Sequence, residues 1–113
     1  MKVNKTLNMT MLCDFYELTM GNGYFVSGMK DQICYFDVFY RNVPDNGGFA
    51  IAAGLEQVVE YIQDLHFSAE DIAYLRGRKL FDEGFLKYLE DFRFTGDIFA
   101  VPEGTPIFPK EPI

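Results

Sequence analysis

The chain has 113 residues, enough for one small domain and too few for two ordinary ones. Hydrophobic residues make up 49% and charged residues 24%, which is a globular composition and excludes an intrinsically disordered chain. A net charge of -7, with 10 lysines and arginines and no basic stripe, argues against nucleic acid as a partner.

The aromatic content is high, with 12 Phe and 7 Tyr in 113 residues. So small a domain cannot hide every ring, so we expect some to face a partner surface. Residues 1–12 lack the apolar stretch of a signal peptide, and no apolar run approaches the roughly 20 residues of a membrane span. We therefore expect a cytoplasmic protein. Cys13 and Cys34 are too few for a disulfide framework or a zinc site, so no metal site is predicted.

The stretch "CDFYELTM" predicts the start of a helix over residues 15–26, with Asp14 and Glu17 spaced as in a capping box. Gly21 and Gly23 weaken that helix, a cost usually accepted where another backbone comes close. Two apolar stripes follow its turns: Phe15, Leu18 and Phe25 on one side, and Tyr16, Met20 and Tyr24 on the other. Such a helix is buried on two sides or lies between two bodies.

Residues 33–40, "ICYFDVFY", predict a strand that is apolar on both faces and therefore central in a sheet. Asp37 and Arg41 stand out as charges near its end. The loop of residues 42–48 contains a glycine pair, Gly47-Gly48, that is either a simple turn or an anion-binding turn before a helix.

Three more helices are predicted in chain order. The first has carboxylates on its solvent-facing side and apolar residues on the other, at Ile51, Leu55, Val58, Val59 and Ile62. Ser68 and Asp71 predict a capping box before a short helix with Ile72 and Leu75, and Asp82 starts another with Phe85, Leu86 and Leu89 buried.

The C-terminal part contains prolines too regularly spaced for a helix, at positions 102, 106, 109 and 112, after a short predicted strand over residues 98–101. Extended segments need sheet partners, and nothing after them supplies any. The architecture therefore looks interrupted at this end.

No complete catalytic set is present. His66, the only histidine, follows a predicted helix and suits a surface or helix-end position better than a catalytic base. Tyr16 either fills the core or stacks on a flat aromatic ligand. Arg41 either pairs with Asp37 or presents its planar fork to a phosphate or carboxylate.

Three stretches closely resemble the N-terminal region of nicotinate phosphoribosyltransferases: "CDFYELTMGNGYF", "YFDVFYRNVPDNGGFAIAAGLEQVVEYI" and "FSAEDIAYLRGRKLFDEGFLKYLEDFRFTGDIFAVPEGTPIFPKEP". The family pattern is T-D-L-Y-Q-L-T-M, then F-[ED]-x-F-x-R, F-x-x-E-D-I-x-Y-L and F-x-F-x-G-D-[IV]-x-A-x-x-E-G. The match runs in order from about residue 10 to the last residue.

The resemblance implies an α+β fold: the N-terminal domain of a type II phosphoribosyltransferase, with helices on a small mixed sheet, spanning residues 1–113 and incomplete without an α/β barrel. It implies that the whole enzyme makes nicotinate mononucleotide and diphosphate from nicotinate and 5-phosphoribosyl 1-diphosphate, in NAD biosynthesis. ATP hydrolysis through a phosphorylated histidine, with Mg²⁺, assists that ligase-like glycosyltransferase reaction. The resemblance further implies a homodimer whose active sites are shared between subunits.

Carried over residue by residue, Tyr16 matches the tyrosine implied to stack on the nicotinate ring, and Arg41 matches an arginine that points toward the phosphoribosyl diphosphate. Cys13 stands where threonine is usual and Glu17 where glutamine is usual, so the charge beside the pocket differs. The family's phosphorylated histidine lies beyond residue 113, and His66 does not take its place.

No catalytic residue, metal ligand or cofactor site is therefore assigned to this segment, and we expect it to be inactive alone. Two alternatives stay open. One is a non-catalytic interaction or regulatory module that keeps this domain, and the other is a relative acting on nicotinamide. The preference between nicotinate and nicotinamide, and the oligomeric state of the segment, are not fixed by these residues.

Overall fold

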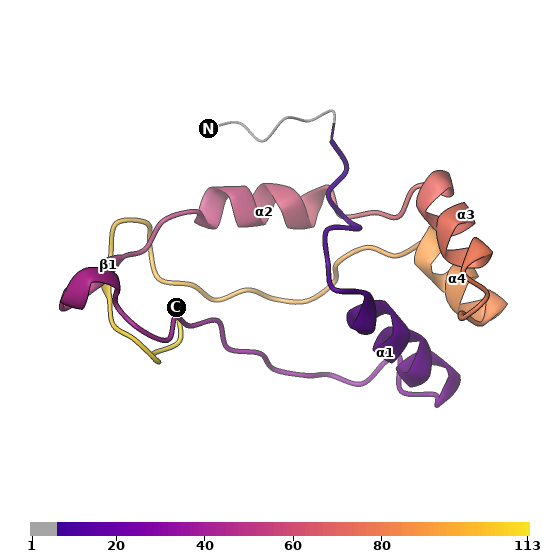
Figure 1. Cartoon of the computed structure of the whole chain (residues 1–113), viewed down its shortest axis with the longest axis horizontal. Coiled ribbons are helices and arrows are strands. Elements are labelled where there is room, and N and C mark those ends of the chain that lie inside the picture. Colours follow the sequence, from indigo (N-terminus) through magenta and orange to yellow (C-terminus); the bar gives the residue numbers. More distant parts are fainter. Residues whose placement is uncertain (1–6) are drawn as a thin grey trace.

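Four α-helices and one small sheet make up the regular structure of residues 7–113, the part that this computed structural model describes. Helices α1 (Phe15–Val26), α3 (Ala69–Gly77) and α4 (Glu83–Glu90) gather at one end of the molecule (Figure 1). The sheet lies at the other end, and α2 (Leu55–Gln63) runs between the two. The α+β class is thus confirmed. The predicted absence of a leader concerns residues 1–12, of which residues 1–6 lie outside the described part.

The core sits between α3 and α4. Five side chains there are buried together, as the apolar spacing of both helices predicts: Ile72, Leu75, Phe85, Leu86 and Leu89. Burying each contributes on the order of 1.5–3 kcal/mol, which is enough to hold two short helices that would be unstable alone.

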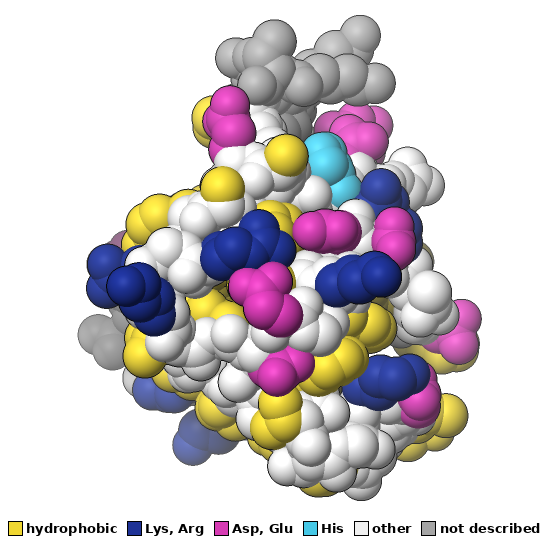
Figure 2. All heavy atoms as spheres, turned by 90° about the vertical axis from the view of Figure 1, so that its right-hand side faces the viewer, with side chains coloured by type: hydrophobic (Ala, Val, Ile, Leu, Met, Phe, Trp, Pro, Cys, Tyr) yellow, Lys and Arg dark blue, Asp and Glu magenta, His cyan; other side chains and the backbone are white. Residues whose placement is uncertain are grey.

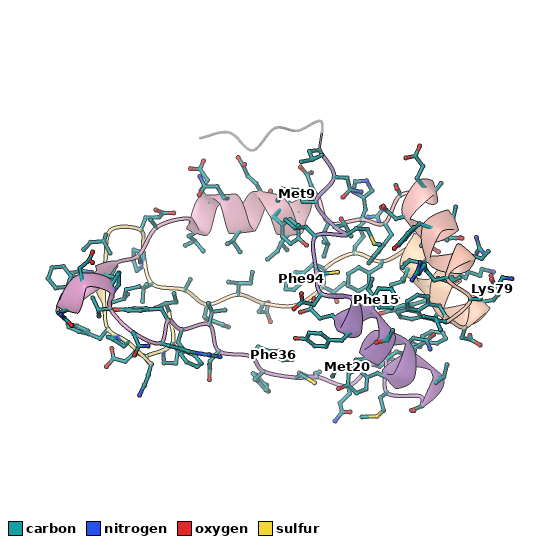
Figure 3. All side chains as sticks on the ribbon, viewed as in Figure 1. Met9, Phe15, Met20, Phe36, Lys79 and Phe94 are labelled. Carbon is teal, nitrogen blue, oxygen red and sulfur yellow. The ribbon has the colours of Figure 1, made fainter. Side chains whose placement is uncertain are left out.

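Helix α1 adds one of its two predicted stripes to this core. Phe25 packs on Phe85 and Tyr88, with ring centroids 5.8 and 5.5 Å apart, and Phe15 meets Phe81 edge to face at 5.8 Å. Figure 3 shows Phe15 pointing toward α4, whereas Met20 lies on the side of α1 away from the other helices. Tyr16, Met20 and Tyr24, which we call the outer stripe of α1, are all exposed. One stripe of α1 is thus packed on the core, and burial of the outer stripe against a second body stays a prediction.

Two of the three predicted caps form. Ser68 Oγ accepts from the Asp71 N–H at 3.1 Å, and the Asp71 carboxylate accepts from the Ser68 N–H at 2.8 Å, a complete capping box. Asp82 accepts from the N–H groups of Gly84 and Phe85. The cap predicted at Asp14 is wrong, since its side chain accepts no hydrogen bond from the first turn of α1.

The strand predicted over residues 33–40 does not form. The segment is extended, but within residues 33–37 no backbone group makes a hydrogen bond to another backbone group, and Tyr35 and Phe36 are 94% and 89% exposed. The strand predicted over residues 98–101 does not form either, since Val101 N–H, which donates to the Ile113 carbonyl, is its one backbone group bonded to the described chain. An extended segment becomes a strand only when a neighbour pairs with it, and helices packed on a mixed sheet are accordingly not what this chain shows.

The sheet consists instead of two short antiparallel strands, β1 (Ala50–Ile51) and β2 (Pro106–Ile107), with Ala50 opposite Ile107. The helix predicted to start at Ile51 therefore begins later, after Gly54, whose positive φ of 104° suits glycine. Gly47-Gly48 follow a short 3-10 turn, η1 (Pro44–Asn46), and precede a strand, so an anion-binding turn before a helix is wrong.

The first turn of α2 is held by a residue far along the chain. One carboxylate oxygen of Glu103 accepts from the N–H of Gly54 at 3.0 Å and from the N–H of Glu56 at 3.4 Å. A carboxylate at a helix N-terminus satisfies free N–H groups and favours the helix dipole. Glu103 thus fixes the start of α2 against the turn that leads into β2.

The caps give a direct test of which aspartate supports its helix. Asp82→Ala removes two accepted hydrogen bonds at the start of α4 and should lower the free energy of unfolding by about 1 kcal/mol. Asp14→Ala, at the corresponding position of α1, should change it by less than half as much. Urea denaturation measures both free energies of unfolding, provided that the variants unfold with the same dependence on urea concentration. Equal losses for Asp82→Ala and Asp14→Ala would contradict the assignment.

Candidate functional site

Tyr16 lies in the first turn of α1, on the outer stripe. Its side chain is 59% exposed, and its hydroxyl makes no hydrogen bond to another described residue. A tyrosine that fills a core would be buried, with a partner for its hydroxyl. The interpretation of Tyr16 as core is therefore wrong for this chain, and one face of its ring is open.

A hollow of about 480 Å³ lies between residues 12–17, at the start of α1, and Tyr61 of α2. Its lining carries two carboxylates and no cation, and consists of Leu12, Cys13, Asp14, Glu17 and Tyr61. Tyr16 itself is not in the lining. The contribution of Tyr61 could not be read from the sequence, because it depends on how α2 approaches a segment more than 40 residues away.

Two ionisable groups in this hollow have raised pKa values, chiefly because of burial. Burial, followed by the nearby carboxylates of Glu17 and Asp14, raises the pKa of the Cys13 thiol. Burial, followed by Cys13 and Glu17, raises the pKa of Tyr61. Burial, and after it the neighbouring negative charge, thus favours the protonated, neutral form of both groups. The hollow is therefore an unfavourable place for an anion.

Arg41 lies in a different part of the molecule. It precedes η1, at the sheet end, whereas α1 lies at the opposite end of the long axis (Figure 1). No ion pair joins Arg41 to Asp37, so the structural alternative for this arginine is not formed. Its neighbour Tyr40 is anchored, since the Tyr40 hydroxyl donates to the Ile107 carbonyl at 2.7 Å. The structure thus fixes the backbone beside Arg41 but does not bring Arg41 and Tyr16 together.

His66 has a structural environment. Its Nδ1 lies 2.6 Å from the Asp64 carbonyl, and its backbone N–H donates to the buried Thr10 hydroxyl at 3.1 Å. It joins the end of α2 to the segment that leads into α1, which confirms a helix-end residue. Within residues 7–113, no three His, Cys, Asp or Glu side chains gather as a metal ion would require.

The end of the helical bundle carries mixed charge. Figure 2 shows lysines and arginines interspersed with carboxylates on this face, without an unbroken basic area. Arg76 accounts for part of the mixture, since its guanidinium binds Glu83 at 3.0 Å and lies 3.9 Å from Glu90. None of the helices described in residues 7–113 has the length and apolar character needed to cross a membrane.

Comparison with known sequences decides the family. A sequence model described as the nicotinate phosphoribosyltransferase N-terminal domain matches residues 11–113. The chain belongs to the nicotinate phosphoribosyltransferase family. The resemblance found in its motifs is thereby confirmed, and the segments of both Tyr16 and Arg41 lie inside the matched region.

Curated relatives agree with the family match. Nicotinate phosphoribosyltransferase pncB2 of Mycobacterium tuberculosis is 42% identical over 102 residues, covering 90% of this chain and 22% of the relative. The Caenorhabditis elegans relative is 37% identical, with 91% and 19% covered, and the Bacillus subtilis relative is 32% identical, with 94% and 22% covered. The chain thus spans about a fifth of the length of the curated relatives it matches.

The charge of the hollow can be measured through the Cys13 thiol. Glu17→Gln removes the larger of the two carboxylate effects on Cys13, so the pKa of Cys13 should fall and the thiolate fraction at pH 8 should rise. Iodoacetamide should then alkylate Cys13 several-fold faster, with the exposed Cys34 as an internal reference. Glu56→Gln, a carboxylate outside the lining, is the matched control. An unchanged Cys13 rate in Glu17→Gln would show that the carboxylate does not act on the thiol.

Proposed function

We propose that this chain is the N-terminal part of an enzyme that forms nicotinate mononucleotide and diphosphate from nicotinate and 5-phosphoribosyl 1-diphosphate. The reaction, coupled to ATP hydrolysis, brings nicotinate into NAD biosynthesis. The family match over residues 11–113 is the observation that carries this proposal. The part assigned to this chain is to supply substrate-binding side chains, and the chemical step belongs to the remainder of the enzyme, including an α/β barrel.

Tyr16 is assigned to the nicotinate ring. Its side chain is exposed on α1, and neither packing nor a hydroxyl partner among residues 7–113 accounts for it. A flat pyridine ring stacked on it would gain roughly 1 kcal/mol beyond the burial of area. Met20 and Tyr24 continue the same exposed stripe, which supports placing Tyr16 at a contact with a second subunit of a cytoplasmic homodimer.

The charge beside Tyr16 limits how nicotinate can lie. Asp14 and Glu17 line the adjacent hollow, where the nicotinate carboxylate would be repelled. The ring must then stack with its carboxylate directed away from this hollow, toward cations supplied by the rest of the enzyme. This chain thus stacks on the nicotinate ring, and another part of the same protein binds its carboxylate.

Arg41 is assigned to the phosphoribosyl diphosphate. It is exposed and not paired with Asp37, and a planar guanidinium binds phosphate oxygens in a bidentate manner. ATP and Mg²⁺ are assigned to the full-length enzyme. The described residues contain no cluster that fits a metal ion, so no step is derived through Mg²⁺ here.

One observation favours a different substrate. The hollow beside Tyr16 carries negative charge, which would tolerate the uncharged amide of nicotinamide better than the carboxylate of nicotinate. A non-catalytic interaction module is a further alternative, supported by the many exposed aromatic side chains. Steady-state kinetics with nicotinate and nicotinamide on the full-length protein distinguish the first alternative from the proposal.

Substitution of Tyr16 in the full-length enzyme tests the stacking role. Tyr16→Ala should raise the KM for nicotinate roughly tenfold, about 1.4 kcal/mol, whereas Tyr16→Phe keeps the ring and should change it little. Tyr74→Ala, at an exposed tyrosine on α3, is the control and should leave KM unchanged. Small and equal effects of Tyr16→Ala and Tyr16→Phe would remove Tyr16 from the site.

The isolated segment should be inactive. Purified 113-residue chain, supplied with nicotinate, 5-phosphoribosyl 1-diphosphate, ATP and Mg²⁺, should give no nicotinate mononucleotide detectable by chromatography, because no catalytic set is present. Product formed at a rate proportional to chain concentration would overturn this expectation. Sequencing the DNA after codon 113 distinguishes the enzyme from a stand-alone module: an in-frame barrel supports the enzyme, and a stop codon supports the module.

A further inference from the structure

One polar side chain joins α1 to the start of α4. Asn22 lies four residues after Leu18 and three before Phe25, so it shares the side of α1 that packs on the core. Asn22 is half-buried, and its Oδ1 accepts from the backbone N–H of Asp82 at 2.9 Å. This bond joins residues 60 positions apart in the chain. It is directional, whereas the apolar contacts around it are not.

The bond completes the cap of α4. In the capping box of α3, Ser68 and Asp71 bond reciprocally, so the N–H of the capping residue finds its acceptor three residues later. The corresponding position in α4 is Phe85, whose side chain has no acceptor, although the Asp82 carboxylate binds the first turn in the usual way. Asn22 supplies the missing acceptor from another helix. The start of α4 is thus also the anchor of α1.

Glycines on both helices let α1 and α4 approach closely beside this bond. A Cβ atom on Gly21 would lie 3.4 Å from Cζ of Phe85. A Cβ atom on Gly84 would lie 3.3 Å from Cε1 of Phe25. Each helix therefore offers a glycine to a phenylalanine ring of the other, and the two ring centroids are 5.8 Å apart. Only a narrow range of rotation of α1 preserves these contacts together with the Asn22 bond.

Tyr16 has no comparable anchor of its own. Its ring is exposed, and Asp14 does not cap the first turn of α1. An α-helix is stiff over six residues, so Asn22 fixes the orientation of Tyr16 at about 9 Å along the axis and about 120° around it. With side chains about 5–6 Å from the axis, turning α1 by about 20° would displace the tyrosine ring by about 2 Å. Such a displacement disturbs the stacking of two flat rings.

We propose that Asn22 is a positioning residue for nicotinate binding: by accepting from the Asp82 N–H it sets the rotation of α1, and thereby the direction in which the Tyr16 ring faces. Asn22 itself touches no substrate. The inference rests on the proposed function, in which Tyr16 stacks on nicotinate, and adds the residue that orients that ring. Loss of the bond should weaken nicotinate binding and leave the chemical step and the second substrate unaffected.

Kinetics of the full-length enzyme test this role. Asn22→Ala removes the acceptor and should raise the KM for nicotinate about fourfold, with kcat and the KM for 5-phosphoribosyl 1-diphosphate unchanged. Asn22→Asp retains an oxygen acceptor on a side chain of the same length and should bring the KM for nicotinate back to within about twofold of the parent. Ile72→Val, which lowers stability from within the α3–α4 core, is the matched control and should leave all three constants unchanged. Equal changes in Asn22→Ala and Ile72→Val would make Asn22 a purely structural residue and overturn the proposal.

A double-mutant cycle separates the orientation of Tyr16 from any other effect of Asn22. With Tyr16→Ala in place there is no ring to orient, so adding Asn22→Ala should not raise the KM for nicotinate further. Multiplicative effects of the two substitutions would show that Asn22 acts without Tyr16, and the proposal would be wrong. If Tyr16→Ala raises KM and Asn22→Ala does not, the positioning role alone is wrong. If Tyr16→Ala has no effect, the stacking role itself is wrong and this inference falls with it.

Gly84→Ala reaches the same contact from α4. The added Cβ would crowd Phe25 and lie 2.9 Å from Oδ1 of Asp82, so it should disturb the packing of α1 without changing any residue of that helix. We expect the KM for nicotinate to rise by a similar factor. Gly77→Ala, where an added Cβ meets nothing within 4 Å, is its control. Should Asn22→Ala fail to fold, this pair still decides, because equal KM values for Gly84→Ala and Gly77→Ala would contradict the proposal.

Discussion

Backbone hydrogen bonding decides which parts of this chain have regular structure. A helix satisfies its backbone groups within itself, so four helices form in the predicted order, although α2 begins after Gly54 and not at Ile51. A strand needs a neighbour, and residues 33–37 have none within the described chain. The consequence is an uneven molecule, with a packed helical end and long extended connections that lead to a sheet of only two residues per strand.

The sequence predicted the helical end well because its information is local. Asp82 and Ser68 cap their helices as the residue types and spacing require, and the core residues Leu75 and Leu86 lie where the apolar pattern puts them. Asp14 does not cap its helix although its spacing is equally good, and its side chain lines the hollow beside Cys13. Residues 33–40 had the composition of a central strand, but composition describes only one of the two partners that a ladder requires.

The sequence predicted which residues belong to the candidate site, but not where those residues lie in the fold. Motif similarity indicated Tyr16 and Arg41, and the family match places both within the recognised domain. No periodicity could show that Tyr16 stays exposed, that Tyr61 approaches Cys13, or that Arg41 lies at the opposite end of the molecule from α1. Those facts arise from contacts between distant segments. Tyr16 and Arg41 lie on separate surfaces of the chain. Each surface needs residues from another segment or subunit to form a pocket.

The carboxylate of Glu103 at the start of α2 has a consequence for the order of assembly. Gly54 and Glu103 are 49 residues apart, whereas the core of α3 and α4 joins residues closer together in the chain. Closing the longer loop costs more entropy, and during synthesis Glu103 emerges only after α1, α2, α3 and α4 have been synthesised. Helix α2 must therefore wait, with its first N–H groups bound to water, until the turn before β2 arrives. The α3–α4 pair can form early, and α2 is the last of these four helices to be fixed in place.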